Sequence, residues 1–191
     1  MLCLGSVESG DAIWPGRTYL RFKDATNMTD RLGALNALVR SHAPHAEPAL
    51  ERFYEMFRRE PLVIDSWFAL QAGAPEVDGK VFARAKQLLQ HPDFSIRNPN
   101  RARSLLWSLC SGNPATFHRP DGAGYAVWAD HVIALDSINP QFAARFSRAL
   151  DRWSQLVEPY RGAARAALQR VAAKPDLSDN VREIVDNALG I

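Results

Sequence analysis

The five histidines are the residues of this chain best suited to metal or acid–base chemistry. No H-E-x-x-H occurs, so the two-histidine zinc site with its glutamate base is missing from the sequence. His42 and His45 lie three residues apart, but Pro44 between them predicts a loop, and no carboxylate stands at a helical spacing from both. A G-x-S-x-G nucleophile elbow and a P-loop are also missing. We therefore expect no catalytic residue, no metal site and no cofactor in this chain.

A G-x-G pattern, Gly122-Ala123-Gly124, precedes a helix expected to begin near Tyr125. Amides at a helix start can hold a phosphate. No strand precedes this pattern, however, and the third glycine of a dinucleotide site is missing. The favoured interpretation is a tight turn in which glycine permits unusual dihedral angles.

Arginines near expected helix starts are stronger candidates for a binding role. Arg101 and Arg103 follow one Asn-Pro pair, while Gln141 and Arg145, which are four residues apart and share a helix face, follow another. A cation at a helix N-terminus opposes the macrodipole at a cost of roughly a few tenths of a kcal/mol. Each arginine therefore calls for an ion pair with another helix, a solvated position, or a ligand such as a carboxylate or a peptide end. The sequence leaves these alternatives open.

The elements that would position these side chains are helices. From about Asn27 onward, apolar residues recur at steps of three and four, as in the stripe Met28, Leu32, Leu35 and Val39. The pattern predicts about nine helices or more and no strand after residue 23. Short connections favour antiparallel neighbours, packed as a bundle or as the stacked pairs of a HEAT or armadillo superhelix. No repeat period is visible in the residues themselves, so the firm prediction is an all-α fold.

Residues that typically begin or interrupt helices agree with this prediction. Each of three Asn-Pro pairs places a good N-cap residue before a proline at the first helical position: Asn98-Pro99, Asn113-Pro114 and Asn139-Pro140. The opening of the chain differs, because glycines, serines and Pro15-Gly16 interrupt any helical pattern there. We therefore expect an irregular segment over residues 1–20 and one helical-repeat domain over residues 21–191.

Composition excludes several classes of function. The 191 residues are 47% hydrophobic and 23% charged, a globular balance, and a net charge of +2 gives no bulk attraction to nucleic acid or to a membrane surface. No apolar run is long enough to span a bilayer, and the N-terminus lacks the pattern of a secretory signal. Cys3 and Cys110 lie far apart, so we expect a buried structural thiol at Cys110 and a reducing, cytoplasmic location.

Several blocks of this sequence together resemble the C-terminal part of bacterial aminopeptidase N, the alanyl aminopeptidase. These blocks are residues 27–32, 98–105, 112–118, 121–125 and 139–141. Their order and spacing match the family from about Tyr19 to the C-terminus, whereas the opening residues do not resemble it.

The resemblance implies an all-helical superhelix that packs over a catalytic domain and encloses the substrate cavity of a zinc peptidase. Zinc and the catalytic glutamate would lie in that upstream domain, which this chain lacks, so we expect the chain to be inactive alone. The implied partners are the catalytic domain, in the same protein or an adjacent fragment, and a peptide held in the assembled cavity. The positions that match cavity-lining residues are Arg103, Gln141 and Arg145. The alternative is an independent helical-repeat module that binds another protein through its concave face.

Overall fold

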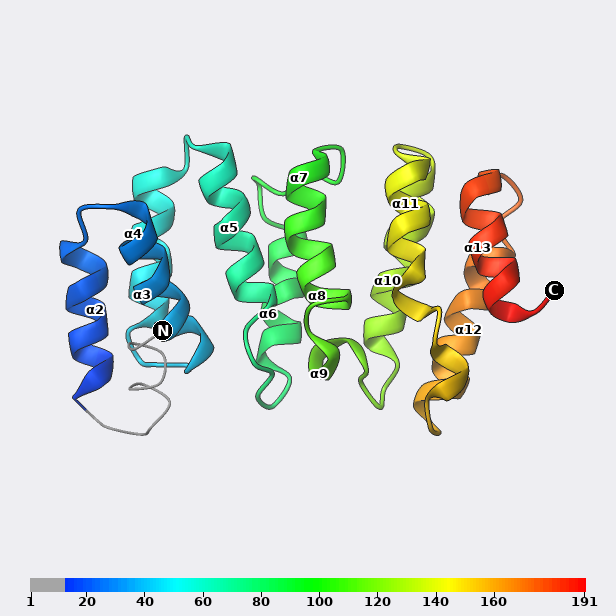
Figure 1. The fold of residues 1–191 in the computed structure, drawn as a ribbon, viewed down its shortest axis with the longest axis horizontal. Coiled ribbons are helices and arrows are strands. Elements are labelled where there is room, and N and C mark those ends of the chain that lie inside the picture. The colour runs from blue at the N-terminus through cyan, green and yellow to red at the C-terminus, as the bar shows by residue number, and fades with distance from the viewer. Residues whose placement is uncertain (1–12) are drawn as a thin grey trace.

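The computed structural model describes residues 13–191, and every regular element in that range is helical (Figure 1). The first half comprises α2 (Trp14–Asp24), α3 (Met28–Arg40), α4 (Ala46–Phe57), α5 (Pro61–Ala72), α6 (Lys80–Leu89), α7 (Pro99–Ala102), the π-helical turn η1 (Arg103–Trp107) and α8 (Ser108–Cys110). The second half comprises α9 (Pro114–Phe117), α10 (Ala123–Asp136), α11 (Pro140–Ser147), the 3-10 turns η2 (Arg148–Leu150) and η3 (Trp153–Gln155), α12 (Tyr160–Ala172) and α13 (Asp179–Leu189). The predicted all-α fold class is confirmed.

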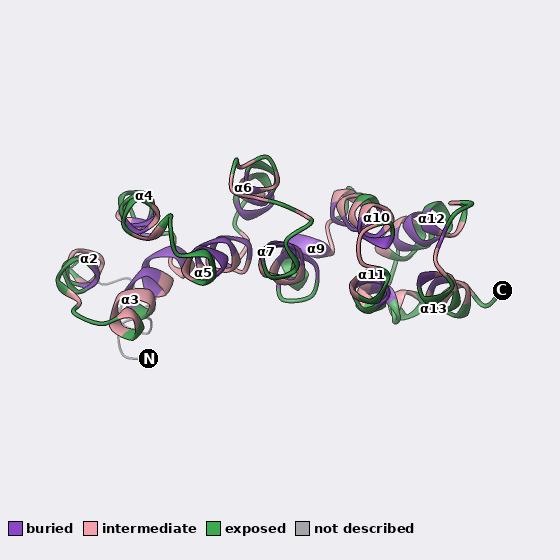
Figure 2. Cartoon of the chain, turned by 90° about the horizontal axis from the view of Figure 1, so that it is seen from above, coloured by how far each residue is buried: buried purple, intermediate pink, exposed green. Residues whose placement is uncertain are grey.

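The helices stack in pairs that form two layers (Figure 2). The first helix of each pair lies in one layer, namely α2, α4, α6, α10 and α12. The second helix of each pair lies in the other layer, namely α3, α5, the continuous stretch α7–η1–α8, α11 and α13. Contacts run within each pair and between neighbours of one layer, as from α10 to α12 and from α11 to α13. This arrangement is the predicted superhelix of paired antiparallel helices, with α2 at one end and α13 at the other (Figure 1).

All three Asn-Pro pairs begin helices as predicted. The side chain of Asn98 accepts hydrogen bonds from the backbone N–H groups of residues 100 and 101, at 3.1 and 3.2 Å. Asn113 accepts from the N–H of residue 116, and Asn139 from that of residue 142 at 3.0 Å. In each case the following proline takes the first helical position, where its missing N–H costs nothing.

One apolar core runs through the array of described helices. Its largest fully buried side chains include Trp128, Tyr125, Phe22 and Phe53. Burying a large apolar side chain of this kind contributes about 1.5–3 kcal/mol, so tertiary packing provides most of the stability of these short helices. Cys110 lies in this core with 4% of its surface exposed, and burial raises the pKa of its thiol. The predicted buried structural thiol is confirmed.

The G-x-G pattern forms a tight turn at the start of α10. Gly122 is the N-cap residue and has a φ of 68°, in the left-handed region that favours glycine. Gly124 lies against the end of α9, where an added Cβ would stand 2.1 Å from the carbonyl oxygen of Phe117. Glycine at position 124 therefore permits close packing of two backbones, and the turn interpretation is confirmed.

The prediction of an irregular segment over residues 1–20 is wrong for residues 14–20, which belong to α2. Pro15 stands in the first turn of α2, where proline is tolerated, so it begins the helix instead of breaking it. Thr18 and Phe22 are buried on one face of α2, and the ring of Phe22 lies 6.5 Å from that of Phe53. The packing of this face against the core therefore outweighs the local sequence pattern, which predicts irregular structure. Residues 1–12 lie outside the described part of the chain.

Candidate functional site

Two of the three predicted site residues, Arg103 and Arg145, line the same pocket. This pocket lies between η1 and α11, both in the second layer, and has a volume of about 340 Å³. The other residues that line it are Ser104, Trp107, Ser108 and Phe142. We call this cavity the arginine pocket. It combines two cations, two hydroxyls and two aromatic walls, a set suited to a carboxylate attached to an apolar group.

Arg103 begins the π-helical turn η1, and its side chain lines the pocket. Within η1, Leu105 and Leu106 are fully buried in the core, whereas Arg103 and Trp107 lie on the other side. Residues 103, 104, 107 and 108 line the pocket together, because positions three and four apart in a helical stretch share a face. Turns of the π-helical type occur frequently at functional sites. Arg103 is exposed and makes no ion pair among the described residues.

Arg145 is positioned by an aromatic ring. Its guanidinium carbon lies 5.6 Å from the centroid of the Trp107 ring, a cation–π contact across the pocket. The prediction that the charge of Arg145 opposes the helix macrodipole is wrong. The helix α11 is only eight residues long, and Arg145 lies in its last turn. A cation there interacts favourably with the helix dipole.

Gln141 lies one turn before Arg145 on α11 but lines a different cavity. This neighbouring cavity, of about 590 Å³, separates α11 from α13. Its lining is largely polar and includes Arg148, Asp151, Asn180, Glu183 and Asn187. The structure therefore places Gln141 beside the arginine pocket and not within it.

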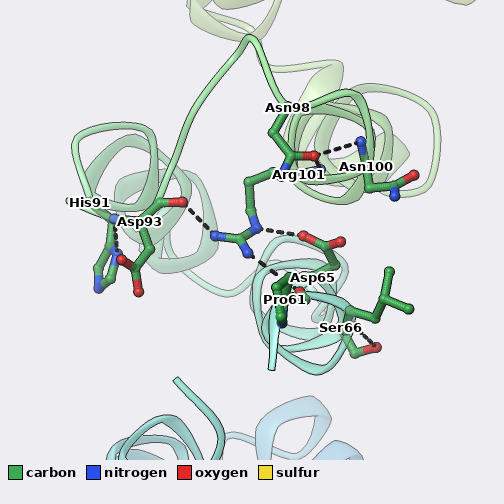
Figure 3. Close-up of polar contacts among 9 residues, drawn as sticks. Pro61, Asp65, Ser66, His91, Asp93, Asn98, Asn100 and Arg101 are labelled. Atoms are coloured by element: carbon green, nitrogen blue, oxygen red, sulfur yellow. Dashed lines mark hydrogen bonds and ion pairs between the residues drawn. The ribbon is translucent and has the colours of Figure 1, made fainter. Parts of the chain in front are cut away.

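Arg101, only two residues before Arg103, forms an ion pair with another helix, the first of the three alternatives that the sequence leaves open (Figure 3). It is 6% exposed, and its Nε donates to Asp65 Oδ1 of α5 at 2.5 Å. Its other nitrogens donate to the carbonyl oxygens of Asp93 and Pro61, and its guanidinium lies 4.9 Å from the centre of the Phe68 ring. We call this group the Arg101 cluster. It ties α7 to α5 and to the segment that precedes α7.

Sequence reasoning missed Trp107 and Phe142 as parts of the candidate site. Trp107 stands four residues after Arg103, a spacing that places two residues on one face of a helix and that could have identified it. The apolar pattern of the sequence predicts that Phe142 is a core residue, whereas the structure places it half-buried at the pocket wall. The aromatic half of the arginine pocket was therefore not predicted.

No group of three or more His, Cys, Asp or Glu side chains in residues 13–191 is arranged to hold a metal ion. Among the helices of this same range, none combines the length and the apolar character needed to cross a bilayer.

Stacked helix pairs of this geometry define the class of armadillo, or ARM, repeat domains. A family model described as a domain of unknown function, DUF3458_C, with ARM repeats matches residues 1–190, and the chain belongs to this family. The match begins at residue 1, so the sequence similarity extends further toward the N-terminus than the predicted limit near Tyr19.

Curated relatives identify the larger proteins in which such a domain occurs. Aminopeptidase N of Caulobacter vibrioides is 44% identical over 169 residues, which cover 88% of this chain and 19% of that protein. Aminopeptidase N of Escherichia coli is 36% identical over 169 residues, with the same coverage. The chain therefore spans about a fifth of the length of these relatives. The resemblance to their C-terminal domain is confirmed.

A solved structure gives the same result for the fold. The crystal structure of Legionella pneumophila aminopeptidase A in complex with aspartic acid matches with a TM-score of 0.85 and 31% sequence identity. The match covers 93% of this chain and 21% of that protein. Sequence and fold thus relate this chain to one part of larger aminopeptidases.

Proposed function

We propose that this chain acts as the C-terminal domain of a zinc-dependent aminopeptidase that removes N-terminal residues from peptides. In this role it caps the catalytic domain, lines the substrate cavity and performs no hydrolysis by itself. The observation that carries the proposal is the arginine pocket, an open cationic site on a domain whose relatives are aminopeptidases. The cations of this pocket have no ion-pair partner among the described residues, unlike the buried Arg101.

The proposed task of the pocket is to bind the part of a peptide that lies beyond the bond being cleaved. Arg103 and Arg145 can each donate two parallel hydrogen bonds to a carboxylate, or single bonds to peptide carbonyls. Gln141, in the neighbouring cavity, offers both a donor and an acceptor. These contacts would lower the free energy of the bound peptide and take no part in bond making, so they would act mainly on KM.

Zinc, in this proposal, belongs to the catalytic domain, because the described residues of this chain offer no set of ligands for it. The catalytic domain is the proposed partner, in the same protein or in an adjacent chain. The buried free thiol of Cys110 is compatible with a reducing compartment and supports a cytoplasmic location.

Complementation tests the proposal. The purified 191-residue chain, supplied with zinc, is expected to leave an alanyl anilide uncleaved. The Caulobacter vibrioides relative, truncated to remove the region matched by this chain, is expected to regain activity when the chain is added. Stoichiometric zinc binding and cleavage by the chain alone would overturn the proposal. Failure to restore activity, together with capture of a defined partner unrelated to aminopeptidases, would instead support an independent interaction module.

A further inference from the structure

The cavity that separates α11 from α13, in the second layer, has a lining unlike that of the arginine pocket (Figure 2). Three carboxamide side chains line it, those of Gln141 in α11 and of Asn180 and Asn187 in α13. All three residues are exposed, and their side chains make no hydrogen bond with any described residue. Each carboxamide therefore keeps both a donor and an acceptor free for a ligand. We call this cavity the carboxamide groove.

The spacing of the two asparagines suits an extended peptide. Asn180 and Asn187 are seven positions apart in α13, so they lie on one face of the helix, two turns from each other. At a rise of about 1.5 Å per residue, this separation is roughly 10 Å along the helix axis. Three residues of an extended chain span about the same length, at about 3.3 Å each. A peptide that runs along α13 can therefore present a backbone N–H or C=O group to each carboxamide.

The lining of the carboxamide groove carries one unpaired charge, that of Glu183. This residue is exposed on α13 and makes no hydrogen bond or ion pair with any described residue. The other two charged residues of the lining, Arg148 and Asp151, pair with each other at 3.4 Å. Because Glu183 stands between Asn180 and Asn187 in α13, a peptide held by the two carboxamides passes its carboxylate. This placement favours a cationic side chain on the peptide.

The helix that forms one wall of the groove is fixed at both ends. Before the start of α13, the backbone N–H of Ser178 donates to Asp136 of α10 at 2.9 Å. Near its end, Trp153 Nε1 donates to the carbonyl oxygen of Ala188 at 2.8 Å, which ties α13 to the segment that follows α11. The apolar part of the lining consists of Ala144, Ile184 and Ala188. A groove that is already formed loses little conformational entropy when a ligand binds.

We propose that the carboxamide groove binds an extended stretch of peptide that carries a lysine or arginine side chain. The carboxamides hold the peptide backbone, and Glu183 receives the cation. The inference rests on the proposed function for its occupant, the substrate peptide, and it names the class of that substrate, basic peptides. Continuity of the two sites supports this occupant, because Gln141 in the groove and Arg145 in the arginine pocket stand one turn apart on α11.

Capped peptides test the groove separately from catalysis. The first is acetyl-Ala-Ala-Ala-Lys-Ala-Ala-Ala-amide, and the second replaces lysine with norleucine, which has a similar length and no charge. Neither peptide has a free carboxylate for the arginine pocket. In an NMR titration of the 191-residue chain, we expect the lysine peptide to shift backbone amides of α11 and α13. The norleucine peptide is expected to bind about threefold more weakly at low salt, and the difference should shrink at high salt.

Substitution of Glu183 tests the source of this preference. Glu183→Gln keeps the shape of the side chain and removes its charge, so it is expected to abolish the preference for the lysine peptide. Asp186→Asn removes the same charge from the same helix but outside the lining of the groove. This matched control should retain the preference.

Substitution of the two asparagines tests the contacts with the peptide backbone. The double variant Asn180→Ala with Asn187→Ala is expected to weaken both peptides alike, by at least about fivefold, because it removes two hydrogen-bonding groups. Alanine is a better helix former than asparagine, so a loss of affinity in this variant does not reflect a weakened α13. Unchanged affinities in the double variant would overturn the assignment of the carboxamides.

Equal affinity of the two peptides for the original chain would overturn the proposal, as would a preference that survives in Glu183→Gln. Shifts confined to other helices, or no binding of the lysine peptide, would overturn it as well. Complementation with the alanyl anilide does not depend on the groove, because that substrate has no peptide chain to reach it. Failure of the groove therefore leaves the proposed function standing. Failure of complementation, with the lysine peptide bound as expected, would overturn the assignment of the bound peptide as a substrate.

Discussion

Arg101 and Arg103 stand two residues apart in one helical stretch and have opposite environments. At about 100° per residue, their side chains leave the helix roughly 200° apart. Arg101 therefore turns inward to Asp65, while Arg103 turns outward to the arginine pocket. The comparison shows that an arginine near a helix start can stabilise a fold or offer a binding group. The side of the helix on which it lies decides between the two.

The two regions are mechanically connected. The Arg101 cluster holds α7 against α5, and η1 continues directly from α7 into the wall of the arginine pocket. A buried ion pair contributes less to net stability than its short distance suggests, because both charges lose their hydration. Its structural effect is to set the position from which Arg103 and Trp107 project.

Arg101→Ala is expected to produce the largest change in stability. It leaves the Asp65 carboxylate buried without its partner, which typically costs about 3–5 kcal/mol of unfolding free energy. Denaturant unfolding measures this loss. The matched control, Arg103→Ala, should change stability by no more than about 0.5 kcal/mol, because its side chain is exposed and has no ion-pair partner among the described residues. Similar losses in both variants would remove the distinction between the two arginines.

The double variant Arg101→Met with Asp65→Leu refines this prediction. Replacing both charges with apolar side chains of similar size removes the desolvation penalty together with the ion pair. The double variant is therefore expected to recover most of the stability that Arg101→Ala loses. A double variant as unstable as Arg101→Ala would show that geometry, and not the unpaired charge, dominates in this cluster.

Trp107→Leu is expected to have a smaller effect, confined to binding. It removes the ring beneath Arg145, and a cation–π contact of this kind is worth about 0.5–1 kcal/mol at a partly exposed site. The affinity of the chain for N-acetyl-dialanine, a peptide with a free carboxylate, should fall by about two- to fivefold in an NMR titration. The corresponding dialanine amide serves as the control ligand. An unchanged affinity for the free carboxylate would show that Trp107 does not position Arg145.

The smallest predicted effect is a pH dependence at His91, whose Nδ1 accepts a hydrogen bond from the backbone N–H of Asp93 beside the Arg101 cluster. Burial lowers the pKa of His91, and the nearby charge of Arg101 adds to this effect while Asp93 opposes it. Well above pH 6.5, the ordinary pKa of histidine, His91 is neutral in both the folded and the unfolded state, and its full contribution to stability is present. As pH falls below 6.5 toward the lowered pKa, the unfolded chain takes up the proton first, so the unfolding free energy decreases.

Denaturant unfolding at pH 8, 6.5 and 5 measures this dependence. His91→Gln should reduce the loss of stability between pH 8 and pH 5. Part of the loss should remain, because burial also lowers the pKa of His118. A loss of unchanged size in His91→Gln would exclude His91 as its source.

Local features of the fold could be predicted from the sequence. Helix periodicity, the three Asn-Pro caps and the turn at Gly122 depend on residues within a few positions of each other. Burial of Cys110 was predictable because it lies on an apolar helical run. Pairing of the helices in a superhelix required the family resemblance, because the sequence shows no repeat period.

Features that depend on distant contacts could not be predicted. The partner of Arg101 stands 36 positions earlier, and no local pattern indicates it. No residue pattern marks the early end of α11, which places Arg145 in the last turn of this helix. The helix at residues 14–20 depends on the burial of Thr18 and Phe22, and this packing has no local signature.

A chimeric enzyme provides the most direct test of the central claim that the arginine pocket binds peptide beyond the cleaved bond. In it, this chain replaces the matching region of the Caulobacter vibrioides relative, with and without Arg103→Ala and Arg145→Ala. The double substitution should raise KM for alanyl peptides by at least about tenfold, since it removes charge-assisted hydrogen bonds. KM for an alanyl anilide, which has no residue to reach the pocket, should stay nearly unchanged. An equal change in KM for the peptides and the anilide, or an unchanged KM for the peptides, would contradict the claim.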